Sequence, residues 1–168
     1  CVMKEIMLIR HATINDVPEL ARIEGASYPA TEAASEERIR SRVAVYPDYF
    51  WLMEESGSTK GFICGLVSDQ EILVDDMFAD TSFHNPDGKW LLLFSVVTDP
   101  AFRHQKVASR IMEKVLEDTK KRGKTGVILT CKDKLRDFYS RFGFVDEGVS
   151  VSTHGGDKWY QMRLVFPR

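Results

Sequence analysis

LLLFSVVTDPAFRHQKVASRIMEKVLEDTKKR, residues 91–122, predicts a buried strand that leads into an amphipathic helix. Residues 91–97 are almost all apolar, and so short an apolar run is typical of a strand covered on both faces. A polar interruption follows, and from about Phe102 apolar residues recur with a helical period. We expect the helix to end at Gly123, because residues 120–122 place three cations at its negative end.

The start of this helix is a candidate anion site. The first turn of a helix leaves backbone N–H groups without intrahelical partners and carries a partial positive charge. We expect this turn to contain Arg103, His104, Gln105 and Lys106, whose cationic and amide side chains suit a phosphate group. The same pattern also fits an ordinary strand-turn-helix with a solvated basic turn, so spacing alone leaves both interpretations open.

Two blocks of sequence resemble one protein family. The run VVTDPAFRHQKVASRIM resembles the acetyl-CoA motif [R/Q]-x-x-G-x-[G/A] of the GNAT N-acetyltransferase superfamily. The second block, LTCKDKLRDFYSRFGF at residues 129–144, is similar to L-x-C-x-D-x-L-x-x-F-Y-x-R-F-x-F of its arylalkylamine (serotonin) N-acetyltransferase branch. The clear match covers residues 91–145. The resemblance implies an acyltransferase that moves the acetyl group of acetyl-CoA directly to a small primary amine, with an arylalkylamine as the finer expectation, and without a metal.

The predicted elements indicate a single α/β (α+β) domain over residues 1–168. Their order, β-α-α-β-β-β-α-β-α-β-β, implies a mixed central sheet of about seven strands flanked by about four helices. This order resembles the GNAT fold, in which two adjacent central strands splay apart and hold the pantetheine arm. The expected strands lie at residues 3–10, 49–54, 61–68, 91–97, 126–131, 144–152 and 159–166, and the expected helices begin near Asp16, Ser35, Phe102 and Asp133, with a short helix considered at 70–78.

Composition sets limits on the class of protein. The chain has 168 residues, of which 43% are hydrophobic and 29% charged, which suits a globular domain with a sizeable core. A net charge of −2 gives no reason to expect nucleic acid. Three cysteines, Cys1, Cys64 and Cys131, favour a reduced, cytoplasmic protein. No apolar run approaches the ~20 residues of a membrane span, and we expect a monomer or a homodimer.

The resemblance implies a cofactor site along the strand and the helix start. Main-chain N–H groups of residues 104–109 would hold the pyrophosphate, and the main chain near Val97 would bind the pantetheine arm and the thioester oxygen. Lys106 stands where the motif has glycine, which lowers stability if this position needs a positive φ and adds a phosphate partner if it does not. The expected cofactor-binding residues are Val96, Val97, Thr98, Arg103, His104, Gln105, Lys106, Val107, Ala108, Ser109, Phe138 and Tyr139.

Tyr139 is the candidate general acid. The resemblance places a tyrosine at this point of the F-Y-x-R-F block to protonate the departing coenzyme A thiolate. A phenol of pKa ~10 stays protonated at neutral pH and can donate to a thiolate of pKa ~8.5. The alternative is a core tyrosine, because Phe138 and Phe142 lie on the same apolar helical stripe.

The sequence gives the weakest signal for the general base, the residue that would take a proton from the acceptor amine. Vertebrate members of the branch carry two histidines on the central strand, but Leu92 and Phe94 occupy those positions here. Glu32 is the candidate base, because it lies in the loop that lines the amine pocket in relatives. It can equally be a plain charge that approaches a helix, and Asp75 and Asp76 are further candidates.

Several alternatives stay open at the level of sequence. The acceptor can be a protein or peptide amine, a lysine or a polyamine, or the chain can be a module that binds acyl-CoA without catalysis. Cys131 can be considered as an acyl-carrying nucleophile, although it lies in an apolar strand. Aromatic residues that could line an acceptor pocket are Tyr28, Phe50, Trp51, Phe78, Phe83, Trp90 and Phe94.

Overall fold

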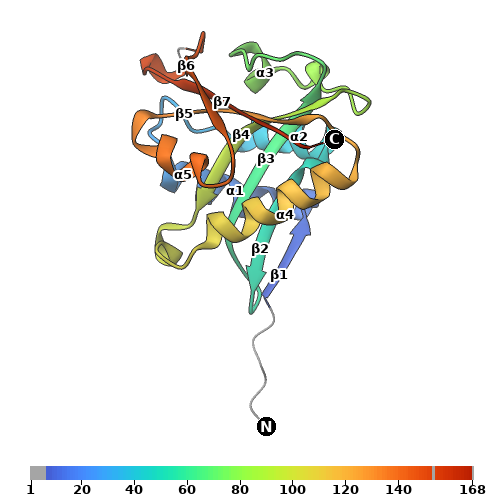
Figure 1. Cartoon of the computed structure of the whole chain (residues 1–168). Coiled ribbons are helices and arrows are strands. Elements are labelled where there is room, and N and C mark those ends of the chain that lie inside the picture. The colour runs from blue at the N-terminus through green and yellow to red at the C-terminus, as the bar shows by residue number, and fades with distance from the viewer. Residues whose placement is uncertain (1–6, 153, 168) are drawn as a thin grey trace. The chain divides into compact units, whose positions relative to one another are not determined.

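The computed structural model describes residues 7–152 and 154–167. Within this part of the chain, seven strands form one mixed sheet in the order β1-β2-β3-β4-β5-β7-β6 (Figure 1). The strands are β1 (Met7–His11), β2 (Phe50–Glu55), β3 (Ser58–Ser68), β4 (Trp90–Thr98), β5 (Gly126–Cys131), β6 (Val145–Val149) and β7 (Tyr160–Val165). The α-helices are α1 (Val17–Ser27), α2 (Glu36–Val45), α3 (Asp76–Ala79), α4 (Val107–Lys121) and α5 (Arg136–Ser140).

The observed element order confirms the predicted mixed α/β fold. The short α3 overlaps the end of the segment 70–78, where a helix was considered, and extends one residue beyond it, so that the described α-helices number five. β1 contains the described part of the predicted first strand, and residues 3–6 lie outside the described residues, as does Cys1. The longest described helix, α4, has 15 residues, and no described helix is long and apolar enough to cross a membrane.

Contacts divide the chain into two compact units, which we describe separately. The first unit combines Cys1–Cys64 with Ser95–Val115, and the second combines Gly65–Phe94 with Leu116–Arg168. β3, β4 and α4 therefore contribute residues to both units. The single domain over residues 1–168 stays a prediction.

In the first unit, β1, β2 and β3 form an antiparallel meander. Glu55 pairs with Ser58, so the hairpin between β2 and β3 has only Ser56 and Gly57 in its turn. Both residues have positive φ, 52° and 80°, as a type I′ turn requires. The predicted six-residue turn is therefore too long, and β3 starts earlier than expected because its first residues extend the pairing.

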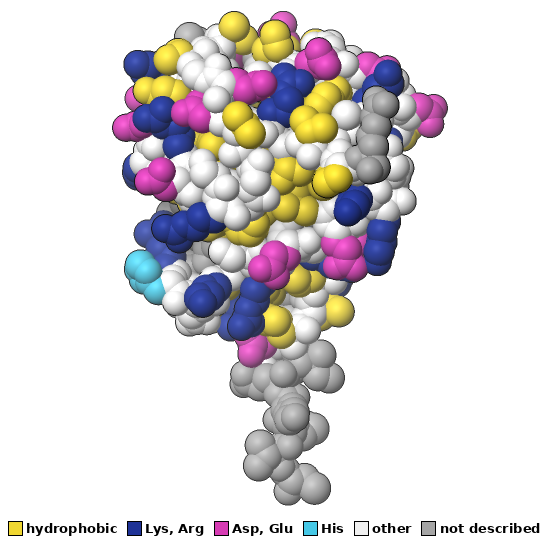
Figure 2. Space-filling model, viewed as in Figure 1, with side chains coloured by type: hydrophobic (Ala, Val, Ile, Leu, Met, Phe, Trp, Pro, Cys, Tyr) yellow, Lys and Arg dark blue, Asp and Glu magenta, His cyan; other side chains and the backbone are white. Residues whose placement is uncertain are grey.

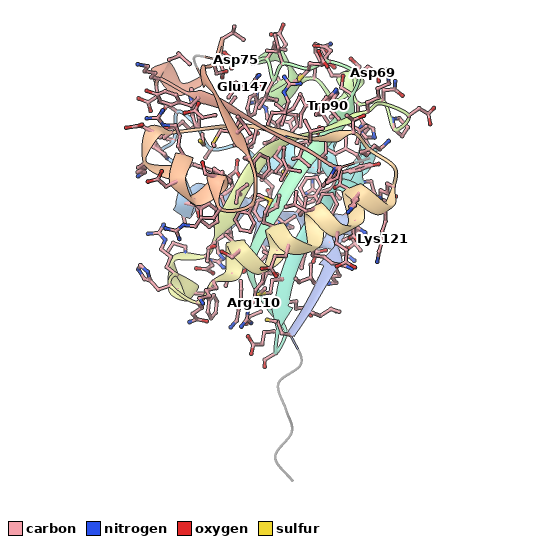
Figure 3. All side chains as sticks on the ribbon, in the orientation of Figure 1. Asp69, Asp75, Trp90, Arg110, Lys121 and Glu147 are labelled. Carbon is pink, nitrogen blue, oxygen red and sulfur yellow. The ribbon has the colours of Figure 1, made fainter. Side chains whose placement is uncertain are left out.

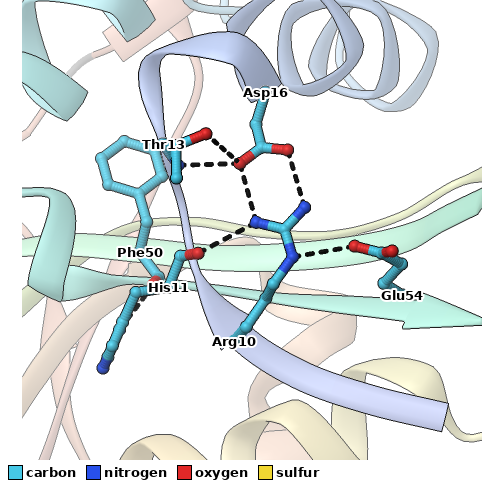
Figure 4. Close-up of polar contacts among 6 residues, drawn as sticks. All are labelled: Arg10, His11, Thr13, Asp16, Phe50 and Glu54. Atoms are coloured by element: carbon cyan, nitrogen blue, oxygen red, sulfur yellow. Dashed lines mark hydrogen bonds and ion pairs between the residues drawn. The ribbon is translucent and has the colours of Figure 1, made fainter. Parts of the chain in front are cut away.

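Arg10 joins the first strand to the approach of α1 (Figure 4). Its two terminal guanidinium nitrogens each donate to a carboxylate oxygen of Asp16 at 2.8 Å, and its Nε donates to Glu54 at 2.8 Å. The main-chain N–H of Thr13 also donates to Asp16, at 2.7 Å. The hydrogen bonds to Asp16 raise the pKa of Arg10, and the same bonds lower the pKa of Asp16. This fork fixes where α1 begins.

The boundaries of α1 and α2 follow their sequence signals. Pro18 lies in the first turn of α1, and the helix ends before Pro29 with Tyr28 in an extended conformation. The Ser35 side chain accepts from the N–H of Arg38 at 3.1 Å, which confirms the predicted cap of α2. The two helices pack against each other.

In the second unit, β5 pairs antiparallel with β7 along its whole length, and β7 pairs with β6. The parallel ladder between β4 and β5 joins Trp90–Leu92 to Gly126–Ile128. A Cβ atom on Gly126 would lie 2.0 Å from the carbonyl oxygen of Leu164, so only glycine permits this pairing. The Arg163 guanidinium lies 4.8 Å from the centre of the Trp90 ring, which Figure 3 labels.

The predicted start of the helix that follows β4, which is α4, is wrong. Pro100–Phe102 form a separate 3-10 turn, and α4 begins at Val107 rather than near Phe102. His104 and Lys106 have φ values of 67° and 61°, which an α-helix does not permit. The predicted end is confirmed, because α4 closes on Lys120 and Lys121 and Gly123 is left-handed with φ 77°.

Candidate functional site

Residues 103–106, which we call the α4 loop, precede the helix instead of forming its first turn. The carbonyl of Lys106 accepts the first helical hydrogen bond, from the N–H of Arg110 at 3.1 Å. The N–H groups of Val107, Ala108 and Ser109 therefore form the open first turn of α4. The positive φ of Lys106 resolves the question raised by its sequence: this position does need the conformation that glycine adopts most easily.

Cations surround the start of α4. Arg103, His104, Gln105 and Lys106 are all exposed. Lys and Arg side chains gather at the lower part of the face in Figure 2, and Figure 3 labels Arg110 on the first turn of α4. The Lys60 ammonium lies 3.4 Å from the side-chain oxygen of Gln105. Backbone donors, a helix start and positive charge together favour a phosphate group.

Asp99 anchors the chain just before the α4 loop. Its carboxylate caps the 3-10 turn by accepting from the N–H of Ala101 at 3.0 Å, and it accepts from Arg22 of α1 at 2.7 Å. Its own N–H donates to the carbonyl of Lys60 at 2.7 Å. The Arg22 guanidinium, followed by the Ala101 N–H, lowers the pKa of Asp99. Asp99 is therefore ionised at neutral pH and holds the turn in place.

The last residues of β4 carry hydroxyl contacts on their main chain. The N–H of Val96 donates to the Tyr28 hydroxyl at 3.4 Å, and that hydroxyl lies 3.5 Å from the Val96 carbonyl. The Ser27 hydroxyl donates to the carbonyl of Thr98 at 3.3 Å. The Val97 carbonyl faces β3, since a Cβ on Gly61 would lie 2.5 Å from it. A pantetheine arm that pairs with Val96 and Thr98 would replace these hydroxyls.

Residues 28–35, which we call the acceptor loop, connect α1 to α2. A tight turn forms where the N–H groups of Glu32 and Ala33 donate to the carbonyl of Pro29 at 2.8 and 2.9 Å. Glu32 is buried, with 7% of its surface exposed. Glu32 is therefore not a solvated surface charge, and its role as a base or as a plain charge that approaches a helix stays a prediction. Burial within the loop makes Glu32 more suitable as a site residue than its sequence context alone indicated.

The sequence interpretation missed a second buried carboxylate, Glu24 of α1. Its two oxygens accept from the main-chain N–H of Ala34 and from the hydroxyl of Ser95, each at 2.7 Å. A signal was present, because Glu24 follows Val17 and Leu20 at the spacing of the apolar stripe. A carboxylate on a buried helical stripe requires hydrogen-bond partners, so this position is a candidate site residue from sequence.

The Tyr28 hydroxyl lies in the same part of the first unit. Burial of the hydroxyl, followed by the charge of Glu24, raises the pKa of Tyr28 well above its usual value. Tyr28 is therefore a neutral phenol, able both to donate and to accept at the main chain of Val96. Burial also raises the pKa of Cys64 to about 11, so this thiol is not ionised at neutral pH.

The second unit contains Tyr139, on α5. The side chain is buried, and its ring packs edge-on against Phe138 and Phe144 at centroid distances of 5.1 and 5.9 Å. Phe142 extends this aromatic group, with its ring 5.3 Å from that of Phe138. The geometry fits both a core tyrosine and a tyrosine fixed by packing for a chemical role.

The remaining candidate residues of the second unit are Leu92, Phe94, Asp75 and Asp76. Leu92 is buried, and Phe94 packs on Phe78 with ring centroids 4.8 Å apart. Asp75 accepts from the Ser152 hydroxyl, and Asp76 is exposed. Among the aromatic residues of the first unit, Phe50 and Trp51 are fully buried core residues. These aromatic residues therefore do not line an open pocket.

Cys131 does not fit an acyl-carrying role. Burial raises the pKa of its thiol to about 12, and its sulfur lies 3.7 Å from that of Met162. A thiolate is the nucleophilic form, so Cys131 is inert at neutral pH. Within residues 7–152 and 154–167, no group of three or more His, Cys, Asp and Glu side chains is arranged to hold a metal ion.

The acetyltransferase (GNAT) family profile matches residues 17–144 of the chain. The chain belongs to this family. The match spans most of the sequence, including the acceptor loop, the α4 loop and α5. The expected membership of the GNAT superfamily is thereby confirmed.

Two curated plant proteins are similar in sequence. A probable glucosamine 6-phosphate N-acetyltransferase 2 of Oryza sativa subsp. japonica is 32% identical over 78 residues, which are 46% of this chain and 47% of that protein. Glucosamine 6-phosphate N-acetyltransferase 1 of the same organism is 27% identical over 128 residues, 76% of this chain and 72% of that protein. The chain thus matches about half the length of the first. Neither is named an arylalkylamine N-acetyltransferase, so that branch stays a prediction.

Solved structures share the fold over nearly the whole chain. A GNAT-like decarboxylase, GphF, in complex with isobutyryl-CoA has a TM-score of 0.81 at 20% identity and covers 94% of this chain and 98% of its own. The loading domain of CurA from Lyngbya majuscula has a TM-score of 0.83 at 15% identity, with 95% and 98% covered. YncA from Salmonella typhimurium, with acetyl-CoA, has a TM-score of 0.68 at 15% identity, with 96% and 95% covered. At these identities the similarity shows the fold alone.

Proposed function

We propose that this chain transfers the acetyl group of acetyl-CoA directly to a small primary amine. The observation that carries the proposal is the α4 loop and the open first turn that follows it, where backbone N–H groups and exposed cations meet at the family motif. This arrangement suits the diphosphate of coenzyme A. Acetyl-CoA then acts as a co-substrate, and no metal is needed.

The cofactor-binding roles extend the family motif to named residues. The N–H groups of residues 104–109 hold the pyrophosphate, with Arg103 and Lys106 as neutralising cations. The main chain of Val96 and Thr98 pairs with the amide groups of the pantetheine arm, after release of the Tyr28 and Ser27 hydroxyls. A backbone N–H near Val97 stabilises the oxyanion of the tetrahedral intermediate.

Tyr139, beside Phe138, is proposed as the general acid. When the tetrahedral intermediate collapses, the carbon–sulfur bond breaks and the electron pair leaves on sulfur. A phenol of pKa ~10 delivers a proton to that thiolate, whose conjugate acid has a pKa of ~8.5. The packing of Phe138 and Phe144 against the ring supports the proposal, because it holds the phenol in one orientation.

Glu32 is proposed as the general base. The acceptor amine arrives mostly protonated, because its pKa is ~10, and it must lose a proton before it attacks the thioester carbonyl. A carboxylate in the acceptor loop can both attract the ammonium and accept a proton from it. The burial of Glu32 supports this role over that of a surface charge.

The acceptor is proposed to be a small cationic amine, with an arylalkylamine as the finer hypothesis. Glu24 on α1 and Glu32 in the acceptor loop are both buried, with Arg42 of α2 as a buried cation in the same unit, and the two carboxylates favour a substrate with positive charge. Glucosamine 6-phosphate is the competing acceptor, since both plant relatives carry its name. A phosphate on the acceptor would need cations that the acceptor loop does not contain.

A thiol-release assay with an amine panel tests the activity. The panel contains tryptamine, phenethylamine, glucosamine 6-phosphate, spermidine and a peptide with a free α-amine. We expect coenzyme A release with at least one cationic amine and the highest kcat/KM for an arylalkylamine. The highest value for glucosamine 6-phosphate would contradict the finer hypothesis. A rise in melting temperature with acetyl-CoA but no thiol release with any amine would favour the non-catalytic acyl-CoA module.

Tyr139→Phe tests the proposed acid. Loss of general acid catalysis lowers kcat on the order of 100-fold, while the Kd for acetyl-CoA stays within about twofold. Tyr160→Phe, a matched change on β7, serves as the control and leaves kcat unchanged. Full activity of Tyr139→Phe would remove this residue from the mechanism.

A further inference from the structure

Glu24 joins three segments of the first unit that are distant in sequence. Its side chain extends from the last turns of α1, and only 3% of the residue surface is exposed. One oxygen accepts from the N–H of Ala34, 10 residues further along, and the other accepts from the hydroxyl of Ser95, 71 residues away. Both distances are 2.7 Å, the short length typical of bonds to a carboxylate.

These bonds connect the acceptor loop to β4. Ala34 is at the end of the loop that carries Glu32, directly before the Ser35 cap of α2. Ser95 is the β4 residue before Val96, whose main chain contacts Tyr28. Tyr28 is the first residue after α1, and its N–H donates to the carbonyl of Glu24 at 3.1 Å. Glu24 thus holds the end of the loop, and the side chains of Glu24 and Tyr28 both reach β4.

We propose that Glu24 is a positioning residue for the acceptor site. It fixes the acceptor loop against β4, and thereby sets the place of the Glu32 carboxylate relative to the main chain at Val96. This inference rests on the proposed acetyl transfer. Catalysis through oriented groups is sensitive to displacements near 1 Å, which can lower a rate about 100-fold.

Stability alone does not explain a carboxylate in this place. Burial of a carboxylate is unfavourable, and replacing buried charged groups with apolar residues of similar volume is often neutral or stabilising. The neighbouring stripe positions of α1, Val17, Leu20 and Ile23, are apolar and fully buried. An apolar residue at position 24 would continue this stripe but would leave the Ala34 N–H without its acceptor. The function of Glu24 is therefore to hold the loop.

Glu24→Gln and Ser95→Ala test the inference with small changes of shape. The glutamine side chain keeps the volume, but its neutral oxygen is a weaker hydrogen-bond acceptor than a carboxylate, so the bond from the Ala34 N–H is weakened. Ser95→Ala removes one bond only. We expect each variant to raise the amine KM about 5- to 10-fold, with the acetyl-CoA KM within about twofold of the original. The matched controls are Glu113→Gln on the exposed face of α4 and Ser41→Ala on α2, both with unchanged KM values.

Hydrogen exchange of the Ala34 amide supplies a readout independent of catalysis. Glu24→Gln should exchange this amide about tenfold faster than the original protein, while amides in β5 keep their rates. A lowered melting temperature with unchanged amine KM would assign Glu24 to stability alone and overturn the inference. Equal changes in both KM values would also overturn it. If the original protein releases no thiol with any amine, the proposed function fails and the inference fails with it, a pattern distinct from active protein with insensitive variants.

Discussion

The acceptor loop and the α4 loop achieve their conformations in opposite ways. The acceptor loop, residues 28–35, is tied down by side chains: Glu24 accepts from Ala34, and Ser35 caps α2. The α4 loop, residues 103–106, is exposed and has two non-glycine residues with positive φ. Its donors lead into the open first turn of α4. Side-chain acceptors bind main-chain N–H groups at the end of the acceptor loop, whereas the N–H groups that follow the α4 loop lie in an open first turn.

This difference matches the charges that the two loops are suited to meet. Buried carboxylates accompany the acceptor loop, and exposed cations accompany the α4 loop. A cationic amine needs a preformed anionic place, while a diphosphate needs unoccupied N–H groups. The α4 loop is anchored by Asp99, which lies before it and accepts from the N–H of Ala101.

Of the changes that test this difference between the two loops, Ala108→Asp should have the largest effect, and it acts on acetyl-CoA binding. A carboxylate in the first turn of α4 repels the diphosphate, and we expect the acetyl-CoA KM to rise on the order of 100-fold. Thermal stability should stay equal or increase slightly, because an acid at a helix start is favourable. Steady-state kinetics and a melting curve measure both. The neutral Ala108→Asn is the matched control, and an unchanged KM for the aspartate variant would mean that no anion binds there.

Ser35→Ala should have the second largest effect, which is a loss of thermodynamic stability. Removal of the cap leaves the N–H of Arg38 without this acceptor, so the free energy of unfolding should fall by about 1 kcal/mol. Urea unfolding measures the change. Ser35→Asp keeps an acceptor at the cap and should retain the original stability. Equal losses in both variants would show that the hydroxyl cap does not stabilise the acceptor loop.

Asp99→Asn tests the anchor of the α4 loop through pH. The folded pKa of Asp99 lies below the unfolded value of ~3.9, so its contribution is fully present above about pH 4 and is lost as pH falls through the folded pKa. We expect the variant to be about 0.5–1 kcal/mol less stable at pH 7, with the gap narrowing below pH 4. Urea unfolding at pH 7 and pH 3 measures the gap. The exposed Asp137→Asn is the control, and a gap that does not change with pH would contradict the ion-pair explanation.

Lys106→Gly should have the smallest effect. Relief of the left-handed conformation favours the variant by about 1 kcal/mol, but glycine also has more freedom in the unfolded chain. The net gain in stability should be about 0.5 kcal/mol, measured by urea unfolding. Lys106→Ala separates the two properties of the residue, because it removes the charge and keeps the unfavourable φ. Equal stability of the glycine and alanine variants would show that position 106 is not under backbone strain.

The elements with strong local signals were predicted from sequence. β5 was predicted with its observed bounds, and α2 was predicted from its Ser35 cap because capping is a local interaction. The end of α4 followed from its final lysines and the left-handed Gly123. These features depend on residues a few positions apart, which is the range that a sequence pattern reports.

The start of α4 and the role of Glu24 depend on conformations and partners that the pattern does not show. Glycine normally marks positive φ, but His104 and Lys106 adopt it here, and the helical period seemed to begin five residues early. Glu24 finds Ser95 at a distance of 71 residues, which no local pattern reports. For the site, the sequence indicated Glu32 and the α4 loop, while the buried network behind Glu32 needed three-dimensional structure.

The hydroxyl groups of Ser27 and Tyr28 also bear on solubility. They contact the main chain of β4 at Thr98 and Val96, where an uncovered strand would present unpaired donors and acceptors to other polypeptides. Unprotected strand margins of this kind recruit foreign strands and seed aggregates. The hydroxyl groups of Ser27 and Tyr28 therefore cover the main chain at this end of β4 and oppose the addition of a strand from another molecule.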